Sequence, residues 1–290
     1  MAQLDCAISL LSSGSATGVL ASLMDRTVEP CDDGQKGHGV MRVLHAASEC
    51  YPLIKTGGLA DVVGALPLAL DAQKGVDATV FLPGFPDVLA GLLDKKTYAR
   101  TTALGGEAVT LISGRTETGL SVIAADCPDL FGFAGNPYQL PDGTDRPGNG
   151  ERFAAFARLA ADLAMGIGRR KGFDVLHAHD WQAGLASAYL RTAESDVRSI
   201  FTIHNLAFQG VFPKSLMASL DLSEAYFGED GLEYWDKVSM LKAGIVYSDW
   251  VTTVSPTYAL EIQMDEGGMG FGGLLRARSG RLRGVLNGVD

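Results

Sequence analysis

Residues 41–67 read MRVLHAASECYPLIKTGGLADVVGALP. The run 42–47 is short and mostly apolar, as expected for a strand that is buried on both faces of a parallel sheet. The pair Gly57-Gly58 follows, and a helical pattern then covers residues 59–73. A strand, a glycine turn and a helix in this order form the first half of a βαβ unit, so the stretch predicts an α/β fold.

The same alternation continues from this stretch to the end of the chain. It predicts a three-layer α/β domain of Rossmann-like type with a mainly parallel sheet. The one antiparallel pair expected lies within residues 108–124, and Ser255 is expected to cap a helix that begins at Pro256. Further strands are predicted at 78–82, 108–112, 120–124, 175–178, 199–203, 250–254 and 284–286, and further helices at 152–168, 182–194, 234–247 and 256–264.

Composition limits the classes of partner. The 290 residues are 47% hydrophobic, and 34 acidic against 24 basic side chains give a net charge of −10. This material can form a folded core, whereas the acidic balance argues against nucleic acid as a partner. No apolar stretch approaches the roughly 20 residues that span a bilayer, so no membrane partner is expected. The four scattered cysteines are typical of reduced thiols, which favours a cytoplasmic protein.

The first forty residues differ from the rest. Their first charged side chain is Asp5 and their first cation is Arg26, which does not fit a secretory signal. Met41 directly precedes the first strong strand. The sequence therefore predicts an extension of unknown role over residues 1–40 and one α/β domain over residues 41–290.

The glycine loop allows two interpretations. Gly57 and Gly58 would let a ligand approach the backbone, the next helix would offer free N–H groups to an anion, and Lys55 would add a positive charge. Alternatively, the loop is a surface turn in which glycine is needed only for its backbone angles. Spacing alone does not separate the two.

Polar side chains also follow two later strands. His177, His179 and Asp180 end one strand, and His204 and Asn205 end the next. The two histidines of the first strand share a face, but no third ligand is evident in the sequence, so a metal site is disfavoured and none is predicted. A single histidine is usually structural. Convergence of three strand ends at one edge of a parallel sheet instead favours a ligand cleft.

These segments resemble the N-terminal region of bacterial glycogen synthases and plant starch synthases, the ADP-glucose-dependent members of glycosyltransferase family 5. The resemblance rests on Lys-Thr-Gly-Gly-Leu-Ala-Asp at 55–61, on His-Ala-His-Asp-Trp at 177–181 and on the run 202–210. It continues through residues 82–86, 241–244, 253–258 and 286–290, in family order.

The resemblance implies the N-terminal half of a GT-B glycosyltransferase. Such an enzyme transfers glucose from ADP-glucose to the non-reducing end of an α-1,4-glucan with retention, and it needs no cofactor or metal. In such an enzyme no side chain attacks the sugar as a nucleophile. The protein instead positions the two substrates and stabilises the charge on the departing diphosphate. The implied catalytic residues are Asp180 and His204, and the implied substrate-binding residues are Lys55, Gly57, Gly58, Tyr138, Asn205 and Gln209.

The resemblance also implies a second domain that these 290 residues do not contain. Residues 287–290, Asn-Gly-Val-Asp, form the motif that ends the first domain in this family. We therefore expect the chain by itself to be inactive. Two alternatives remain open, namely a non-catalytic glucan-binding module and a GT-B transferase that uses another sugar nucleotide.

Overall fold

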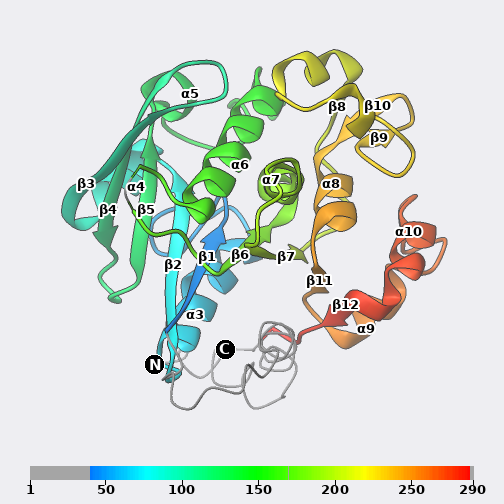
Figure 1. Ribbon diagram of the computed structural model, residues 1–290, viewed down its shortest axis with the longest axis horizontal. Coiled ribbons are helices and arrows are strands. Elements are labelled where there is room, and N and C mark those ends of the chain that lie inside the picture. The colour runs from blue at the N-terminus through cyan, green and yellow to red at the C-terminus, as the bar shows by residue number, and fades with distance from the viewer. Residues whose placement is uncertain (1–39, 169, 288–290) are drawn as a thin grey trace.

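A nine-stranded sheet forms the centre of the computed structural model, which describes residues 40–287 except residue 169 (Figure 1). The predicted extension over residues 1–40 lies outside the described residues, apart from Val40. The strand order is β12-β11-β7-β6-β1-β2-β5-β4-β3. The strands are β1 (Met41–Ala46), β2 (Val76–Pro83), β3 (Leu93–Thr102), β4 (Ala108–Arg115), β5 (Ser121–Asp126), β6 (Val175–His179), β7 (Arg198–Ile203), β11 (Trp250–Thr253) and β12 (Leu282–Gly284).

The sheet is mainly parallel, as predicted. All strands from β12 to β5 in the spatial order run parallel, and β4 pairs antiparallel with β5 as expected. The sequence prediction missed β3, an edge strand that pairs antiparallel with β4. Its sequence, LDKKTYARTT, is polar and mostly exposed, because an edge strand packs little surface and its lysines discourage pairing with other chains.

Helices cover both faces of the sheet and create the three predicted layers (Figure 1). Helix α6 (Asn149–Met165) packs on one face, where Phe156 stacks on Phe81 of β2 with ring centroids 5.0 Å apart. Helices α7 (Asp180–Thr192) and α8 (Met240–Tyr247) lie beside it on this face. Helix α3 (Gly58–Asp71) lies on the opposite face.

The predicted helix over residues 234–247 is wrong in its first half. These residues first form β9 (Glu233–Tyr234) and β10 (Lys237–Ser239), which build a small antiparallel sheet with β8 (Val211–Pro213). The helix begins only at Met240, because the Ser239 side chain accepts the N–H of Lys242 at 3.2 Å and caps it there. The same geometry confirms Ser255 as the cap of α9 (Pro256–Glu261). The remaining helices are α4 (Pro86–Gly91), α5 (Pro128–Phe131) and α10 (Gly272–Ala277), with 3₁₀ turns at Lys214–Ser219, Glu224–Tyr226 and Ser279–Arg281.

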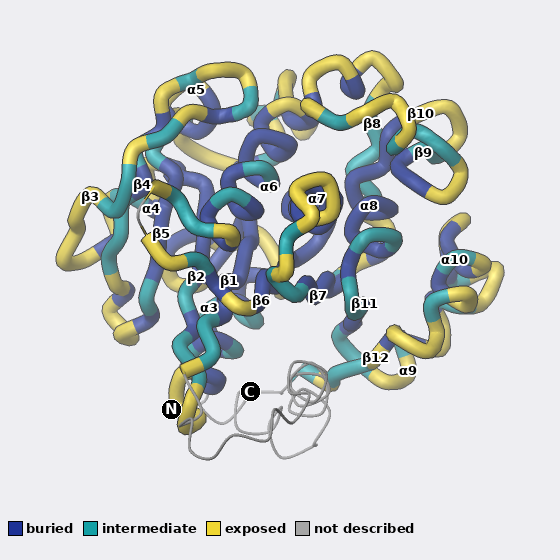
Figure 2. The backbone as a smooth tube through the Cα atoms, in the orientation of Figure 1, coloured by how far each residue is buried: buried dark blue, intermediate teal, exposed yellow. Residues whose placement is uncertain are grey.

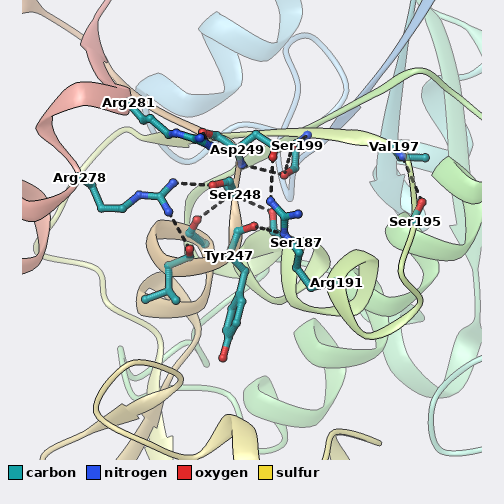
Figure 3. A network of polar contacts seen from close by, with 12 residues as sticks. Ser187, Arg191, Ser195, Val197, Ser199, Tyr247, Ser248, Asp249, Arg278 and Arg281 are labelled. Atoms are coloured by element: carbon teal, nitrogen blue, oxygen red, sulfur yellow. Dashed lines mark hydrogen bonds and ion pairs between the residues drawn. The ribbon is translucent and has the colours of Figure 1, made fainter. Parts of the chain in front are cut away.

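A polar network fixes the amino edge of the sheet. The carboxylate of Asp249, just before β11, accepts the N–H of Ser199 at 2.8 Å and pairs with Arg191 of α7 at 2.7 Å. Figure 3 shows this carboxylate between the two partners, with Arg278 reaching the end of α8. The network ties α7, α8, β7 and β11 together at the edge opposite the carboxyl ends of the strands.

The order of the strands reverses at β1. The chain places β2 to β5 on one side of β1 and later returns to place β6 on the other side. In open α/β sheets, the crevice beyond the carboxyl ends of the strands at such a reversal is where ligands bind. Figure 2 shows β1, β6 and β7 mostly buried. The residues that follow β1 and β6 are also buried, whereas His204 and Asn205 after β7 are partly or fully exposed. No helix in the described part of the chain has the length and apolar character needed to cross a membrane.

Candidate functional site

A cavity of about 700 Å³ lies at this reversal, beyond the carboxyl ends of β1, β6 and β7. Its walls come from the loop that joins β1 to α3, from the start of α7, from the segment after β7 and from the segment around Tyr138. Seven of the sequence-predicted site residues line it, namely Gly57, Gly58, Tyr138, Asp180, His204, Asn205 and Gln209.

A buried glutamate holds the loop after β1. The carboxylate of Glu49, which is 3% exposed, accepts hydrogen bonds from the backbone N–H of Thr56, from its hydroxyl at 2.6 Å and from the N–H of Gly57 at 3.2 Å. Sequence reasoning missed Glu49, which lies three residues after β1, because a glutamate is rarely buried and the sequence does not show that this one is. These three hydrogen bonds tie the loop to the residues that follow β1.

The two glycines are not required by their backbone angles. Gly57 has φ −150° and ψ −167°, an extended conformation open to any residue, and a Cβ atom at Gly57 or Gly58 would meet nothing within 4 Å. The surface-turn interpretation assumed that these backbone angles require glycine, and they do not. The N–H of Gly57 donates to the Glu49 carboxylate, so the N–H groups available to an anion are those of the helix that follows.

Lys55 is the predicted residue that the structure does not bring to the cavity wall. Its ammonium group pairs with Asp61 at 2.7 Å and lies 5.9 Å from the centre of the Tyr51 ring. Both partners of the ion pair are about half exposed, so the pair contributes little to stability. The Lys55 side chain is long, and its contact with a bound ligand stays a prediction.

Tyr138 closes the cavity beside the glycine loop. Its hydroxyl donates to Glu49 at 2.6 Å and lies 2.7 Å from the hydroxyl of Ser48. Burial and the neighbouring Glu49 carboxylate raise the pKa of Tyr138 well above its usual value, so it remains a neutral donor. Tyr138 thus fixes the Glu49 carboxylate that in turn holds the loop.

Asp180 is buried in the cavity wall, with 7% exposure, and has a left-handed φ of 55°. Its carboxylate accepts the backbone N–H of His204 at 2.8 Å, which links the ends of β6 and β7. Burial raises the pKa of Asp180 to about 7, partly offset by hydrogen bonds from the backbone of His204 and Asn205. A strained backbone and a carboxyl group that titrates near neutrality are both frequent at functional sites.

This environment predicts a stability change with pH. The folded pKa of about 7 lies above the ordinary 3.8, so between these values the folded chain keeps a proton that the unfolded chain has lost. Rising pH through that window therefore removes stability. Asp180→Asn lacks this titration. The free energy of unfolding of the variant minus that of the parent chain should therefore increase by on the order of 2 kcal/mol between about pH 5 and about pH 8.

Urea unfolding of both chains at the two pH values measures this difference. Asparagine tolerates the left-handed conformation and keeps an acceptor oxygen for the His204 N–H, so the variant should fold. A difference that does not change with pH would contradict the buried environment assigned to Asp180.

Four histidines meet behind the cavity. His45 of β1 is the neighbour that sequence reasoning missed, since it lies over 130 residues from His177 and His179 and only strand pairing brings the three together. Burial lowers the pKa of His45 to about 3 and that of His204 to about 4, so these side chains are neutral at neutral pH.

The distances between the ring nitrogens of this cluster are short enough to consider a metal site. Ligand nitrogens of His45, His177 and His179 lie within 4.8 Å of one another. However, the rings of His177 and His179 are stacked with centroids 4.1 Å apart, so their lone pairs run side by side and do not converge on one point. Each ring also has a hydrogen-bond partner within the chain. The geometry favours a hydrogen-bonded cluster.

Asn205 and Gln209 extend the wall beyond His204. The side-chain oxygen of Asn205 accepts the N–H of Ala207 at 3.0 Å, and the amide of Gln209 donates to the carbonyl of Met269 at 2.9 Å. These bonds hold the segment after β7. Among the described residues, the second polar group of each amide has no hydrogen-bond partner. Substrate binding by either residue remains a prediction.

The chain resembles known proteins along most of its described length. The family model described as "Starch synthase catalytic domain" matches residues 42–277. Glycogen synthase 2 of Bradyrhizobium diazoefficiens is 50% identical over 250 residues, which are 86% of this chain and 52% of that protein. A glycogen synthase of Rhodopseudomonas palustris is 51% identical over 251 residues, with the same coverage.

A solved structure shows the same fold. The catalytic domain of starch synthase IV from Arabidopsis thaliana, bound to ADP and acarbose, aligns with a TM-score of 0.73 and 31% identity. The alignment covers 87% of this chain and 52% of that chain. The chain thus spans about half the length of the curated relatives and of the solved structure that it matches. The fold, the family match over residues 42–277 and the relatives at about 50% identity agree. The chain belongs to the starch synthase catalytic domain family of glycosyltransferases.

Proposed function

We propose that these 290 residues are the N-terminal half of a glucan synthase that transfers glucose from ADP-glucose to an α-1,4-glucan. One observation carries the proposal. In a chain of this family, the cavity at the reversal of strand order brings Asp180, His204 and a clamped glycine loop together. The relatives named glycogen synthase, and the starch synthase solved with ADP and acarbose, support a nucleotide donor and a glucan acceptor.

The donor diphosphate is proposed to lie against the glycine loop. Residues 57 and 58 leave open space beside the backbone, so an oxygen can approach closely. Helix α3 begins at Gly58 and spans 14 residues, and the N-terminus of such a helix carries partial positive charge that stabilises an anion. Lys55 stands next to the loop and would exchange its exposed ion pair with Asp61 for the diphosphate.

The transferred glucose is proposed to lie beside Asp180 and His204. When the bond to ADP breaks first, positive charge develops on the sugar ring, and an ionised Asp180 in a buried wall stabilises that charge. His204 provides a hydrogen bond to the same sugar. The acceptor hydroxyl then attacks on the face from which ADP leaves, and its proton passes to the departing diphosphate oxygen. Attack on this face accounts for retention.

The other wall of the active site is proposed to come from the half that the relatives contain and these residues do not. The cavity is bounded by one domain only, whereas charge stabilisation of a departing diphosphate needs donors on several sides. We define the joined protein as residues 1–290 followed by the C-terminal half of the Bradyrhizobium glycogen synthase 2.

Incorporation of labelled glucose into glycogen tests the proposed function. The joined protein is expected to incorporate glucose from ADP-glucose, and residues 1–290 alone are expected to show none above a protein-free control. Incorporation from UDP-glucose only would favour another sugar nucleotide. Glycogen binding by residues 1–290 without any incorporation by a folded joined protein would favour a non-catalytic glucan-binding module.

A further inference from the structure

Three of the clustered histidines form a continuous chain of hydrogen bonds that ends at the cavity. Nδ1 of His45 lies 3.2 Å from Nε2 of His179, and Nδ1 of His179 lies 3.0 Å from Nε2 of His204. His45 and His179 are fully buried, whereas His204 is half-buried and lines the cavity. The chain therefore leads from β1 through β6 to the end of β7.

Neutral imidazole carries one proton, so this chain has two possible directions. In the first, His45 donates to His179 and His179 donates to His204, so that all three rings carry the proton on Nδ1. In the second, His204 donates to His179 and His179 donates to His45, so that all three rings carry it on Nε2. Burial keeps the rings neutral, as the lowered pKa values of all three show.

The surroundings of His45 separate the two directions. Among the described residues, Nε2 of His45 is buried and has no hydrogen-bond partner. The second direction would place a proton there and leave a buried N–H donor unsatisfied, which is rare and costly. The first direction leaves only a lone pair at that position. Its last proton is on Nδ1 of His204, for which the described part of the chain provides no partner, and His204 is a residue that lines the cavity.

We infer that His45 and His179 are positioning residues that hold His204 in its Nδ1–H tautomer, so that His204 presents a fixed hydrogen-bond donor to whatever occupies the cavity. Which ring nitrogen of a histidine carries the proton is set by the bond that the other nitrogen makes. The identity of the occupant as a sugar rests on the proposed function. The tautomer itself does not, and it can be measured on residues 1–290.

Nitrogen NMR of the chain labelled with ¹⁵N-histidine tests the tautomer. Protonated and bare ring nitrogens give well-separated pyrrole-type and pyridine-type resonances, and the sequence contains only five histidines. At neutral pH, His45, His179 and His204 should each show a pyrrole-type Nδ1 and a pyridine-type Nε2. A scalar coupling across the hydrogen bond should join Nδ1 of His179 to Nε2 of His204. A pyrrole-type Nε2 on His204 would overturn the inference.

A matched pair of variants tests the positioning. His179→Asn places an amide at the position of Nδ1, where its N–H can still donate, so His204 should keep its pyrrole-type Nδ1. His179→Leu removes the donor, so His204 should shift toward the Nε2–H tautomer that free histidine favours in water. An unchanged His204 spectrum in His179→Leu would overturn the role of His179. If the leucine variant does not fold, the parent spectrum and the asparagine variant still decide the direction of the chain.

Discussion

Replacing Asp180 with asparagine in the joined protein is expected to lower kcat by about 10²–10³-fold, which is the usual cost of removing one preorganised charge-stabilising group. The substitution preserves the shape of the side chain, its acceptor oxygen for the His204 N–H and the left-handed backbone. It removes only the negative charge that forms as the carboxyl group ionises. Since that charge acts on the developing sugar cation and not on the bound donor, KM for ADP-glucose should change little.

Initial rates of labelled glucose incorporation at several ADP-glucose concentrations give both constants. Asp129→Asn, which changes an exposed carboxylate at the start of α5, is the matched control and should keep the parent rate. A kcat within a few-fold of the parent for Asp180→Asn would show that this carboxylate is structural and takes no part in transfer.

Replacing Gly58 with alanine is expected to separate stability from activity. A Cβ atom there meets no protein atom within 4 Å, and Gly58 is the first residue of α3, so alanine should leave stability unchanged or raise it slightly. The same methyl group would occupy the space through which the donor diphosphate approaches the backbone. Misplacement of a bound substrate by about 1 Å costs on the order of 10²-fold, and we expect a loss of this size in kcat/KM for ADP-glucose.

Urea unfolding of residues 1–290 and kinetics of the joined protein measure the two effects. Gly280→Ala is the matched control, because a Cβ atom there also meets nothing within 4 Å and the residue lies far along the chain from the loop. It should likewise leave stability unchanged or raise it slightly, and it should leave kcat/KM unchanged. Full activity of Gly58→Ala would contradict a diphosphate site at this loop.

The parts of the fold that follow from hydrophobic runs were predictable. Strands β1, β6 and β7 are buried on both faces and read as apolar runs, so their positions and the parallel sheet could be deduced. The edge strand β3 could not, because its exposed and charged residues resemble a loop. The antiparallel strands β9 and β10 were missed because the pairing of β10 with β8 and with β9 overrode the helical pattern that leads into α8.

Only those residues of the candidate site that directly follow a strand were predictable from the sequence. Asp180 and His204 come directly after β6 and β7, and topology alone brings such residues to one edge. Glu49 and His45 act through hydrogen bonds to residues that are brought near by folding, and no spacing rule indicates those partners. The same limitation applies to the N–H of Gly57, because no spacing rule indicates its hydrogen bond to Glu49.

A structure of the joined protein with ADP and acarbose would test the central claim most directly, since the related starch synthase was solved with these two compounds. The account predicts the ADP diphosphate against residues 55–58 and a ring of acarbose within hydrogen-bonding distance of Asp180 and His204. Acarbose and ADP bound elsewhere, with the cavity beyond β1, β6 and β7 left to solvent, would contradict it.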